Sequence, residues 1–371
     1  MNSSARYASI GFVVDVSTID PQQKCGGKTL IPGAREAISI LLKQRIPFVI
    51  VTSYTNTTEK EAARDLSAQL ALKIKPRNIL LPQSPFRDCV REYKNKSVLV
   101  LGGDGEKARR MLQEYGFNDV WTSRDVVKLQ YDAASRQKLP AGEEITISAI
   151  FVLWTPENWD LDIRICINLL LSHSSRKGAQ GADRKENNTA AQKEHLEIQP
   201  QLFVCMTDTS LVGDRPFLRR DRTWIDTLVD EWTAKTGKAL EYYHCGTGRD
   251  RVTLAFADKL LNGYNKRMHP TCHPFPRTVY MIGADISFGG NTDRYAAVLS
   301  PGVRRRSIRV DVHGRGLTVH DFDAALKPWH VTSNVKEALE YALAEEYWEC
   351  IEARLTPLFS RPDWARSTAI Y

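Results

Sequence analysis

Short apolar runs alternate with amphipathic stretches over residues 9–130, a pattern typical of strands joined by crossover helices. The apolar runs predict strands at residues 10–14, 46–51, 78–81, 97–101 and 149–153. Between the first two, Ala37, Ile38, Leu41 and Leu42 recur at the spacing of one helix face. Thr58 stands directly before an acidic amphipathic stretch, and such a residue favours a helix N-terminus. The pattern therefore predicts an α/β fold with a parallel sheet.

Regular patterning is interrupted once and then resumes. Residues 172–200 are dense in Ser, Gly, Ala, Gln and Asn with little to bury, so we interpret them as a flexible surface insertion. After them the pattern predicts strands at residues 201–206 and 278–282 and helices at 224–235, 252–261 and 335–354.

The composition is that of a folded protein of more than one domain. The chain has 371 residues, which favours two or three domains, and 42% hydrophobic residues exclude a disordered chain. No run of apolar residues is long enough to cross a bilayer. Seven scattered cysteines with no C-x-x-C pair indicate reduced thiols. The net charge of +7 permits an acidic partner without requiring one.

The residues that end three strands carry a family resemblance. The first strand runs into Asp15, the second into Thr52, and a late strand into Ile282-Gly283. Further matching stretches, in the same order along the chain, include residues 30–34, 66–70, 79–85, 116–120 and 236–240. Together these features resemble the haloacid dehalogenase superfamily of aspartate-nucleophile phosphatases, with a class IIA cap. Within it they look most like the branch that contains the cat-eye-syndrome critical region protein.

The resemblance implies a domain plan. The expected fold is a doubly wound parallel-sheet core made from both chain ends, with a smaller α/β cap inserted between them. On this plan residues 1–86 form the first part of the core, and residues 87–240 form the cap with the insertion near 172–200. Residues 241–371 complete the core and add a C-terminal helix and tail.

The resemblance also implies catalytic roles, several of which this chain does not match. Asp15 is at the position of the nucleophile and Thr52 at the phosphate-binding position. Ser17 replaces the aspartate that acts as general acid and base, and a serine cannot supply that proton near neutral pH. Gly248 is at the position of the charge-neutralising lysine, where Arg249 is a possible substitute.

The metal-binding motif of the family is altered as well. Ala284 and Gly289 replace the two acids linked to Mg²⁺, and Asp285 stands one position late, which turns a side chain to the other face of a strand. If any residues of this chain bind a metal, they are Asp15 and Asp285. We expect no cofactor, or Mg²⁺ if the catalytic alternative below holds.

These departures predict a catalytically degenerate member of the superfamily that acts as a structural or binding subunit. Because the resembled branch is associated with mitochondria, the expected setting is a mitochondrial ribonucleoprotein such as the mitochondrial ribosome or its assembly intermediates, with protein or rRNA partners. A cytoplasmic location is the alternative, because only nine residues precede the first predicted strand, too few for a complete presequence. Two other functions stay open: a Mg²⁺-dependent phosphatase using Asp15, and a phosphate-metabolite sensor without turnover.

Two arginine clusters are candidate contacts for RNA or for a partner protein, since arginine suits bidentate phosphate binding. They are Arg215, Arg219, Arg220 and Arg222, and Arg304, Arg305, Arg306, Arg309 and Arg315.

Two short motifs invite a ligand interpretation. Residues 101–107, with three glycines and a lysine, lack the Walker A pattern, so we favour a tight turn over a nucleotide site. Residues 269–274 hold two histidines and a cysteine without a second pair at zinc spacing, so we favour a proline-rich loop.

Overall fold

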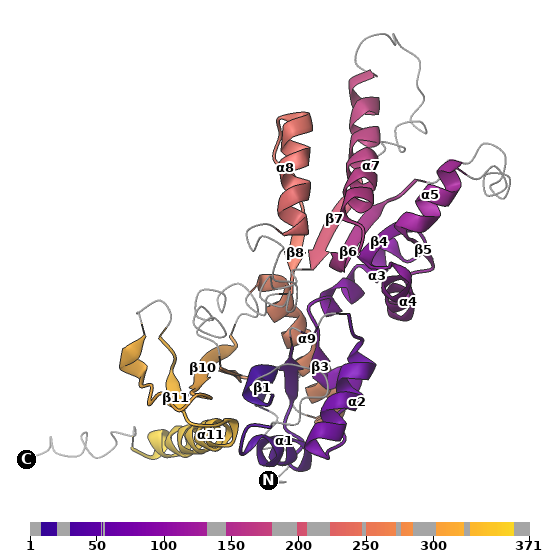
Figure 1. Ribbon diagram of the computed structural model, residues 1–371. Coiled ribbons are helices and arrows are strands. Elements are labelled where there is room, and N and C mark those ends of the chain that lie inside the picture. The colour runs from indigo at the N-terminus through magenta and orange to yellow at the C-terminus, as the bar shows by residue number, and fades with distance from the viewer. Residues whose placement is uncertain are drawn as a thin grey trace, which may run out of the picture. The chain divides into compact units, whose positions relative to one another are not determined.

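The computed structural model describes residues 9–20, 30–52, 54, 56–131, 146–179, 199–205, 223–246, 250–271, 276–284, 302–322 and 327–359. The chain divides into two compact units. The first consists of Met1–Val51, Arg64–Asn78 and Lys259–Tyr371, and the second of Thr52–Ala63 and Ile79–Asp258. Each unit is an α/β structure with its own parallel sheet (Figure 1). The core and cap boundaries expected from the sequence stay a prediction.

The sheet of the first unit is parallel and buried. Its strands run in the order β11-β10-β9-β1-β2. They are β1 (Ile10–Asp15), β2 (Phe48–Val51), β9 (Thr278–Gly283), β10 (Arg304–Val310) and β11 (His330–Thr332). Every residue of β9 and all but the last of β1 are buried, as expected for a parallel sheet covered on both faces. The strands predicted near residues 10, 46 and 278 are confirmed.

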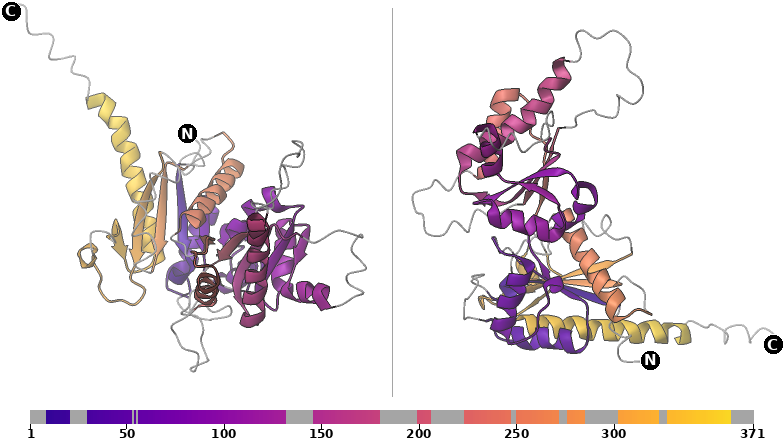
Figure 2. Two further views of the ribbon diagram at one scale, coloured as in Figure 1. Left: turned by 90° about the horizontal axis from the view of Figure 1, so that it is seen from above. Right: turned by 90° about the vertical axis from the view of Figure 1, so that its right-hand side faces the viewer.

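Helices α1 (Ala34–Lys43) and α11 (Val335–Phe359) belong to the first unit, and they contact each other (Figure 1). Helix α11 also contacts β9, β10 and β11, so it packs against the part of the sheet that these three strands form (Figure 2). The helix predicted over residues 335–354 is confirmed and continues to Phe359. Helix α9 (Arg251–Met268) likewise confirms and extends the helix predicted over 252–261.

The second unit contains a five-stranded parallel sheet in the order β5-β4-β6-β7-β8. The strands are β4 (Ser97–Gly103), β5 (Asp119–Trp121), β6 (Ala149–Pro156), β7 (Gln201–Cys205) and β8 (Tyr243–Cys245). Successive residues of one strand enter two different apolar clusters: Leu99 and Ile150 belong to one, and Val98 and Phe151 to the other. Because side chains alternate along a strand, the sheet has an apolar core on each face.

Helices connect the strands of the second unit. They are α3 (Val90–Tyr93), α4 (Glu106–Tyr115), α5 (Ser123–Tyr131), α7 (Trp159–Ala179) and α8 (Trp224–Thr236), and β3 (Ile79–Leu80) precedes them. Helix α7 continues through residues 172–179, the first part of the segment interpreted as an insertion, because its buried first turns allow helical hydrogen bonds to propagate. Residues 180–198 lie outside the described residues.

Two local predictions are confirmed by hydrogen bonds and backbone angles. Helix α2 (Glu59–Leu70) begins with a capping box, in which the amide of Glu61 donates to Thr58 Oγ1 and the amide of Thr58 donates to Glu61 Oε2. The glycine motif after β4 is a tight turn, since the amide of Gly105 donates to the carbonyl of Gly102 at 2.9 Å. No helix in the described part of the chain is both long and apolar enough to cross a membrane.

Candidate active site

Asp15 lies where an open α/β sheet is expected to bind a ligand. It ends β1, which pairs with β2 on one side and with β9 on the other. From β1 the chain continues outward to β2, whereas β9, β10 and β11 follow one another in the opposite direction. The strand order therefore reverses beside β1, and ligands of such sheets bind at the carboxyl ends of the strands next to this reversal.

The Asp15 carboxylate is held by the residue two positions later. The amide of Ser17 donates to Asp15 Oδ1 at 3.0 Å, and Ser17 Oγ donates to Asp15 Oδ2 at 2.6 Å. The hydroxyl of Thr18 donates to the main-chain carbonyl of Asp15 at 2.7 Å and stabilises the short 3₁₀ turn Val16–Thr18 that ends the strand. Asp15 and Ser17 are half-buried. The carboxylate is thus oriented and partly accessible, and its neighbour is a hydroxyl in place of an acid.

Thr52 follows β2 directly in the chain and is 3% exposed. Its main-chain amide donates a hydrogen bond to the carbonyl oxygen of Leu80 at 3.0 Å. Its Oγ1 accepts a hydrogen bond from the amide of Tyr54, also at 3.0 Å. Since Oγ1 accepts in this contact, the hydroxyl can still donate its proton, which is the property that an anion-binding threonine needs. The role of Thr52 in binding phosphate stays a prediction.

Ala284 follows β9, and Asp15 is level with Gly283 because Val14 pairs with Ile282. Ala284 therefore lies at the carboxyl edge next to Asp15, and its side chain carries no ligating atom. Gly248, Arg249, Asp285 and Gly289 lie outside the described residues.

Donors for a divalent cation are few at this edge. Mg²⁺ prefers hard oxygen ligands, and the Asp15 carboxylate is one. Among the described residues, no three His, Cys, Asp or Glu side chains gather as a metal site would require. The described residues thus offer the Asp15 carboxylate toward a divalent cation, Asp285 lies outside them, and we derive no chemical step through a metal.

The arginines of the second predicted cluster bind carboxylates of their own unit or are buried. Arg304 donates to both oxygens of Glu349 at 2.7 and 2.8 Å, and Arg306 Nη2 donates to Glu349 Oε1 at 2.5 Å. The Arg306 guanidinium also lies 4.2 Å from the centre of a Trp329 ring. The remaining members are Arg305 and Arg309, at 5% and 7% exposure, and Arg315, which pairs with Asp311. Arg215, Arg219, Arg220 and Arg222 lie outside the described residues.

His269, the first residue of the predicted proline-rich loop, makes a contact within the fold. His269 is 4% exposed, and its Nε2 lies 3.1 Å from the carbonyl oxygen of Arg45. Cys272 and His273 lie outside the described residues.

Sequence reasoning missed the group that holds the segment before α9. Asp250 accepts the amide of Thr253 at 2.7 Å, the hydroxyl of Thr253 at 2.8 Å and the amide of Gly246 at 3.0 Å. The signal was present, because an Asp three residues before a Thr at the start of an amphipathic run is a capping pattern. Asp250 therefore fixes the main chain on both sides of the segment that contains Gly248.

Comparison with known families and proteins identifies sequence relatives. Residues 25–118 match the family described as haloacid dehalogenase-like hydrolase. A cardiolipin synthase and mitochondrial hydrolase fusion protein of Schizosaccharomyces pombe is 24% identical over 93% of this chain, which spans 55% of that protein. A mitochondrial hydrolase of Saccharomyces cerevisiae is 25% identical over 81% of this chain and 91% of its own length.

Solved structures share the architecture at low sequence identity. A hypothetical protein of Pyrococcus horikoshii is 14% identical, with 90% of this chain and 99% of that chain covered and a TM-score of 0.53. A 4-nitrophenylphosphatase of Thermotoga maritima is 12% identical, with 92% and 99% covered and a TM-score of 0.51. A glycerol phosphate phosphatase of Mycobacterium tuberculosis in complex with magnesium is 13% identical, with 91% and 78% covered and a TM-score of 0.51. The chain therefore shares a two-sheet α/β fold with these structures, and its residues 25–118 are similar in sequence to haloacid dehalogenase-like hydrolases.

Proposed function

We propose that this chain is a hydrolase of phosphate monoesters in which Asp15 is the nucleophile. The observation that carries the proposal is the position of Asp15 at the carboxyl end of the central strand, beside the reversal of strand order. Sequence relatives in two yeasts are described as mitochondrial hydrolases, which supports hydrolysis over a purely structural role.

The proposed reaction has two steps. An oxygen of the Asp15 carboxylate forms a bond to phosphorus, the ester P–O bond breaks, and the leaving oxygen takes a proton. Water then attacks the phosphorus of the aspartyl phosphate, which releases phosphate and regenerates the carboxylate. Ser17 orients the carboxylate through its amide and hydroxyl but is too weak an acid to protonate the leaving oxygen. Water must supply that proton, so we expect turnover mainly of esters with acidic leaving groups, such as 4-nitrophenyl phosphate.

The substitution Ser17→Asp tests the proposal by supplying the missing acid. A correctly placed general acid accelerates such a step by about 10² to 10⁴-fold. We expect Ser17→Asp to raise kcat toward an alkyl phosphate such as glycerol phosphate within that range, in buffer that contains MgCl₂. Ser17→Asn is the matched control, because an amide has a similar shape and cannot release a proton. Adding Asp15→Asn to the Ser17→Asp variant must abolish the gain.

The alternative outcome defines a second candidate. If neither the natural chain nor Ser17→Asp shows turnover that depends on Asp15, the hydrolase proposal is wrong and a catalytically degenerate binding subunit is favoured. Two observations support this candidate: Ser17 contacts both oxygens of Asp15, and Ala284 stands at the position of a metal-linked acid. It would also agree with the proposed placement in the cat-eye-syndrome critical region branch with degenerate motifs.

For a ribonucleoprotein role, a partner that contacts Arg304 or Arg306 would have to compete with Glu349, which binds both side chains. Co-purification of rRNA at low salt with loss at high salt would support that role. We propose a mitochondrial location, by analogy with the two named relatives, and imaging of the tagged full-length protein tests it.

A further inference from the structure

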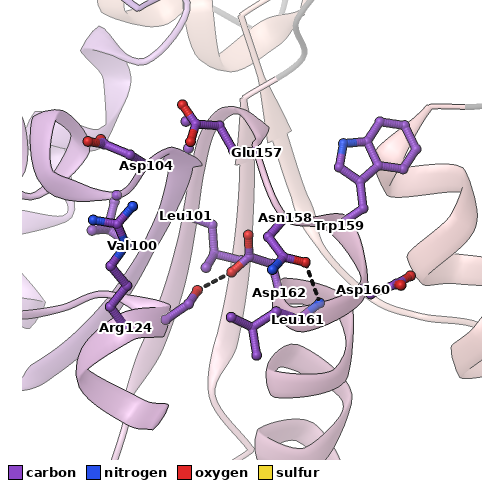
Figure 3. A pocket seen from close by; sticks show the side chains of 14 residues that line it. Val100, Leu101, Asp104, Arg124, Glu157, Asn158, Trp159, Asp160, Leu161 and Asp162 are labelled. Carbon is purple, nitrogen blue, oxygen red and sulfur yellow. Dashed lines mark hydrogen bonds between the residues drawn. The ribbon is translucent and has the colours of Figure 1, made fainter. Parts of the chain in front are cut away.

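The second unit contains a pocket of its own at the carboxyl edge of its sheet. The pocket has a volume of about 580 Å³ and is lined by the end of β4, the start of α5 and the turn from β6 into α7 (Figure 3). Ligand pockets of proteins measure about 300–1,000 Å³, so this one has room for a small organic molecule. The carboxyl edge is also where parallel sheets bind their ligands.

Two glycines at the end of β4, Gly102 and Gly103, are among the residues that line the pocket. Gly102 and Gly103 have φ angles of 149° and 54°, and a Cβ atom on either would lie 3.0–3.1 Å from the indole of Trp154. The register between β4 and β6 shifts between Leu101 and Gly103, and the pairing resumes where Gly103 is level with Pro156.

The charges around the pocket favour a cation. Four carboxylates line it against one guanidinium, that of Arg124; the acids are Asp104, Glu157, Asp160 and Asp162. Asp162, which is labelled in Figure 3, is 6% exposed, and the hydroxyl of Ser123 donates to its carboxylate. Burial raises the pKa of Asp162, and the Ser123 hydrogen bond opposes this rise. A cation in the pocket would stabilise the ionised carboxylate further.

An anion is disfavoured even though helices begin at this edge. Helix N-termini attract anions through unpaired amides. Here side chains of the pocket already accept such amides: Asp104 accepts the amide of Glu106 at 3.1 Å, and Asn158 accepts the amide of Leu161 at 3.2 Å. These two amides are therefore not open to a phosphate, and the single guanidinium of Arg124 is outnumbered by the carboxylates of the lining.

We propose that this pocket binds a small organic amine that carries more than one ammonium group. Separate carboxylates can each pair with one ammonium group, and the partly buried Trp159 offers an aromatic face for a cation or for the aliphatic chain between the charges. The proposal does not depend on Asp15, which belongs to the first unit.

Calorimetric titration of the full chain with spermidine tests the proposal. We expect saturable binding that weakens as salt is added, because exposed charge pairs are screened. The double variant Asp104→Asn with Asp160→Asn should bind about tenfold more weakly, since each exposed ion pair contributes up to about fivefold. Asparagine keeps the oxygen that accepts the Glu106 amide, so the start of α4 is preserved.

Matched variants separate this pocket from general charge effects. Glu241→Gln removes an exposed acid of the same unit that does not line the pocket, and it should leave the affinity unchanged. Asp15→Asn should also leave it unchanged. The proposal is overturned if spermidine does not bind, if the double variant binds as tightly as the natural chain, or if inorganic phosphate binds in its place. Circular dichroism of each variant verifies that it is folded.

Discussion

A ladder of aromatic rings crosses the second sheet, and its two ends differ in burial. Phe151 on β6 stacks on Phe203 of β7 at 4.8 Å between ring centres, and Phe203 stacks on Tyr243 of β8 at 5.2 Å. The three residues are in register across neighbouring parallel strands. Phe151 is fully buried, whereas Tyr243 is 58% exposed. The ladder therefore allows truncation of an aromatic residue to alanine to be compared at a buried and at an exposed position.

Phe151→Ala should destabilise the protein by about 4 kcal/mol. Truncation of a buried phenylalanine costs about 3–5 kcal/mol. The ring of Phe151 also contacts Phe86 and Phe117, each at 5.2 Å between ring centres, and aromatic pairs contribute about 0.5–1.5 kcal/mol each beyond their burial. Tyr243→Ala loses one stacked pair and little buried area, so we expect about 1 kcal/mol.

Equilibrium urea unfolding, followed by circular dichroism, measures both free energies of unfolding. If the two variants lose the same stability within 1 kcal/mol, then ring stacking rather than burial determines the contribution of the ladder, and the reasoning above is wrong.

Three further predictions concern polar contacts. Glu349→Gln should cost about 1–2 kcal/mol, because Arg304 and Arg306 lose a shared carboxylate and both are partly exposed; an unchanged urea midpoint would contradict this. Although burial alone would raise the pKa of Glu349, the hydrogen bonds and charges of the arginines lower it. The stabilisation from Glu349 is therefore present above the unfolded pKa of about 4.3 and is lost as the pH falls through the lower folded value. Urea midpoints between pH 5 and 3 should fall more steeply for the natural chain than for Glu349→Gln, and parallel curves would refute the assignment. Thr58→Ala removes the side-chain half of the capping box and should cost about 1 kcal/mol, whereas Thr58→Ser should cost little.

The pattern of apolar runs was sufficient to predict strands and helices because most strands here are buried on both faces. Ile10 to Val14 form a continuous apolar run that ends at a charged residue, and the structure places that residue, Asp15, at the end of a central strand. The helix start at Thr58 was equally local, since its partner Glu61 is three residues away. Features fixed within a few residues of the chain were therefore accessible without a structure.

Long-range polar contacts were not accessible in this way. Arg306 and Glu349 are 43 residues apart, and no sequence pattern indicates that α11 directs Glu349 toward β10. The composition of β10 therefore could not show that Glu349 binds two of its arginines, and the contact of this cluster with a partner stays a prediction. The pocket of the second unit was missed for a related reason. It is assembled from three separate segments, of which only the glycine turn has a recognisable pattern.

The two sheets place polar groups at their carboxyl edges with different electrostatic consequences. At the first edge, Asp15 is the carboxylate at the end of β1, and Ser17 donates to both of its oxygens. Such a carboxylate can attack an electrophile but has no acidic neighbour at the Ser17 position to protonate a leaving group. At the second edge, four carboxylates exceed one guanidinium, and the adjacent amides are already accepted by side chains. The fold alone therefore does not determine the ligand: under the two proposals above, Asp15 attacks a phosphorus electrophile at the first edge and an ammonium group binds beside Asp162 at the second.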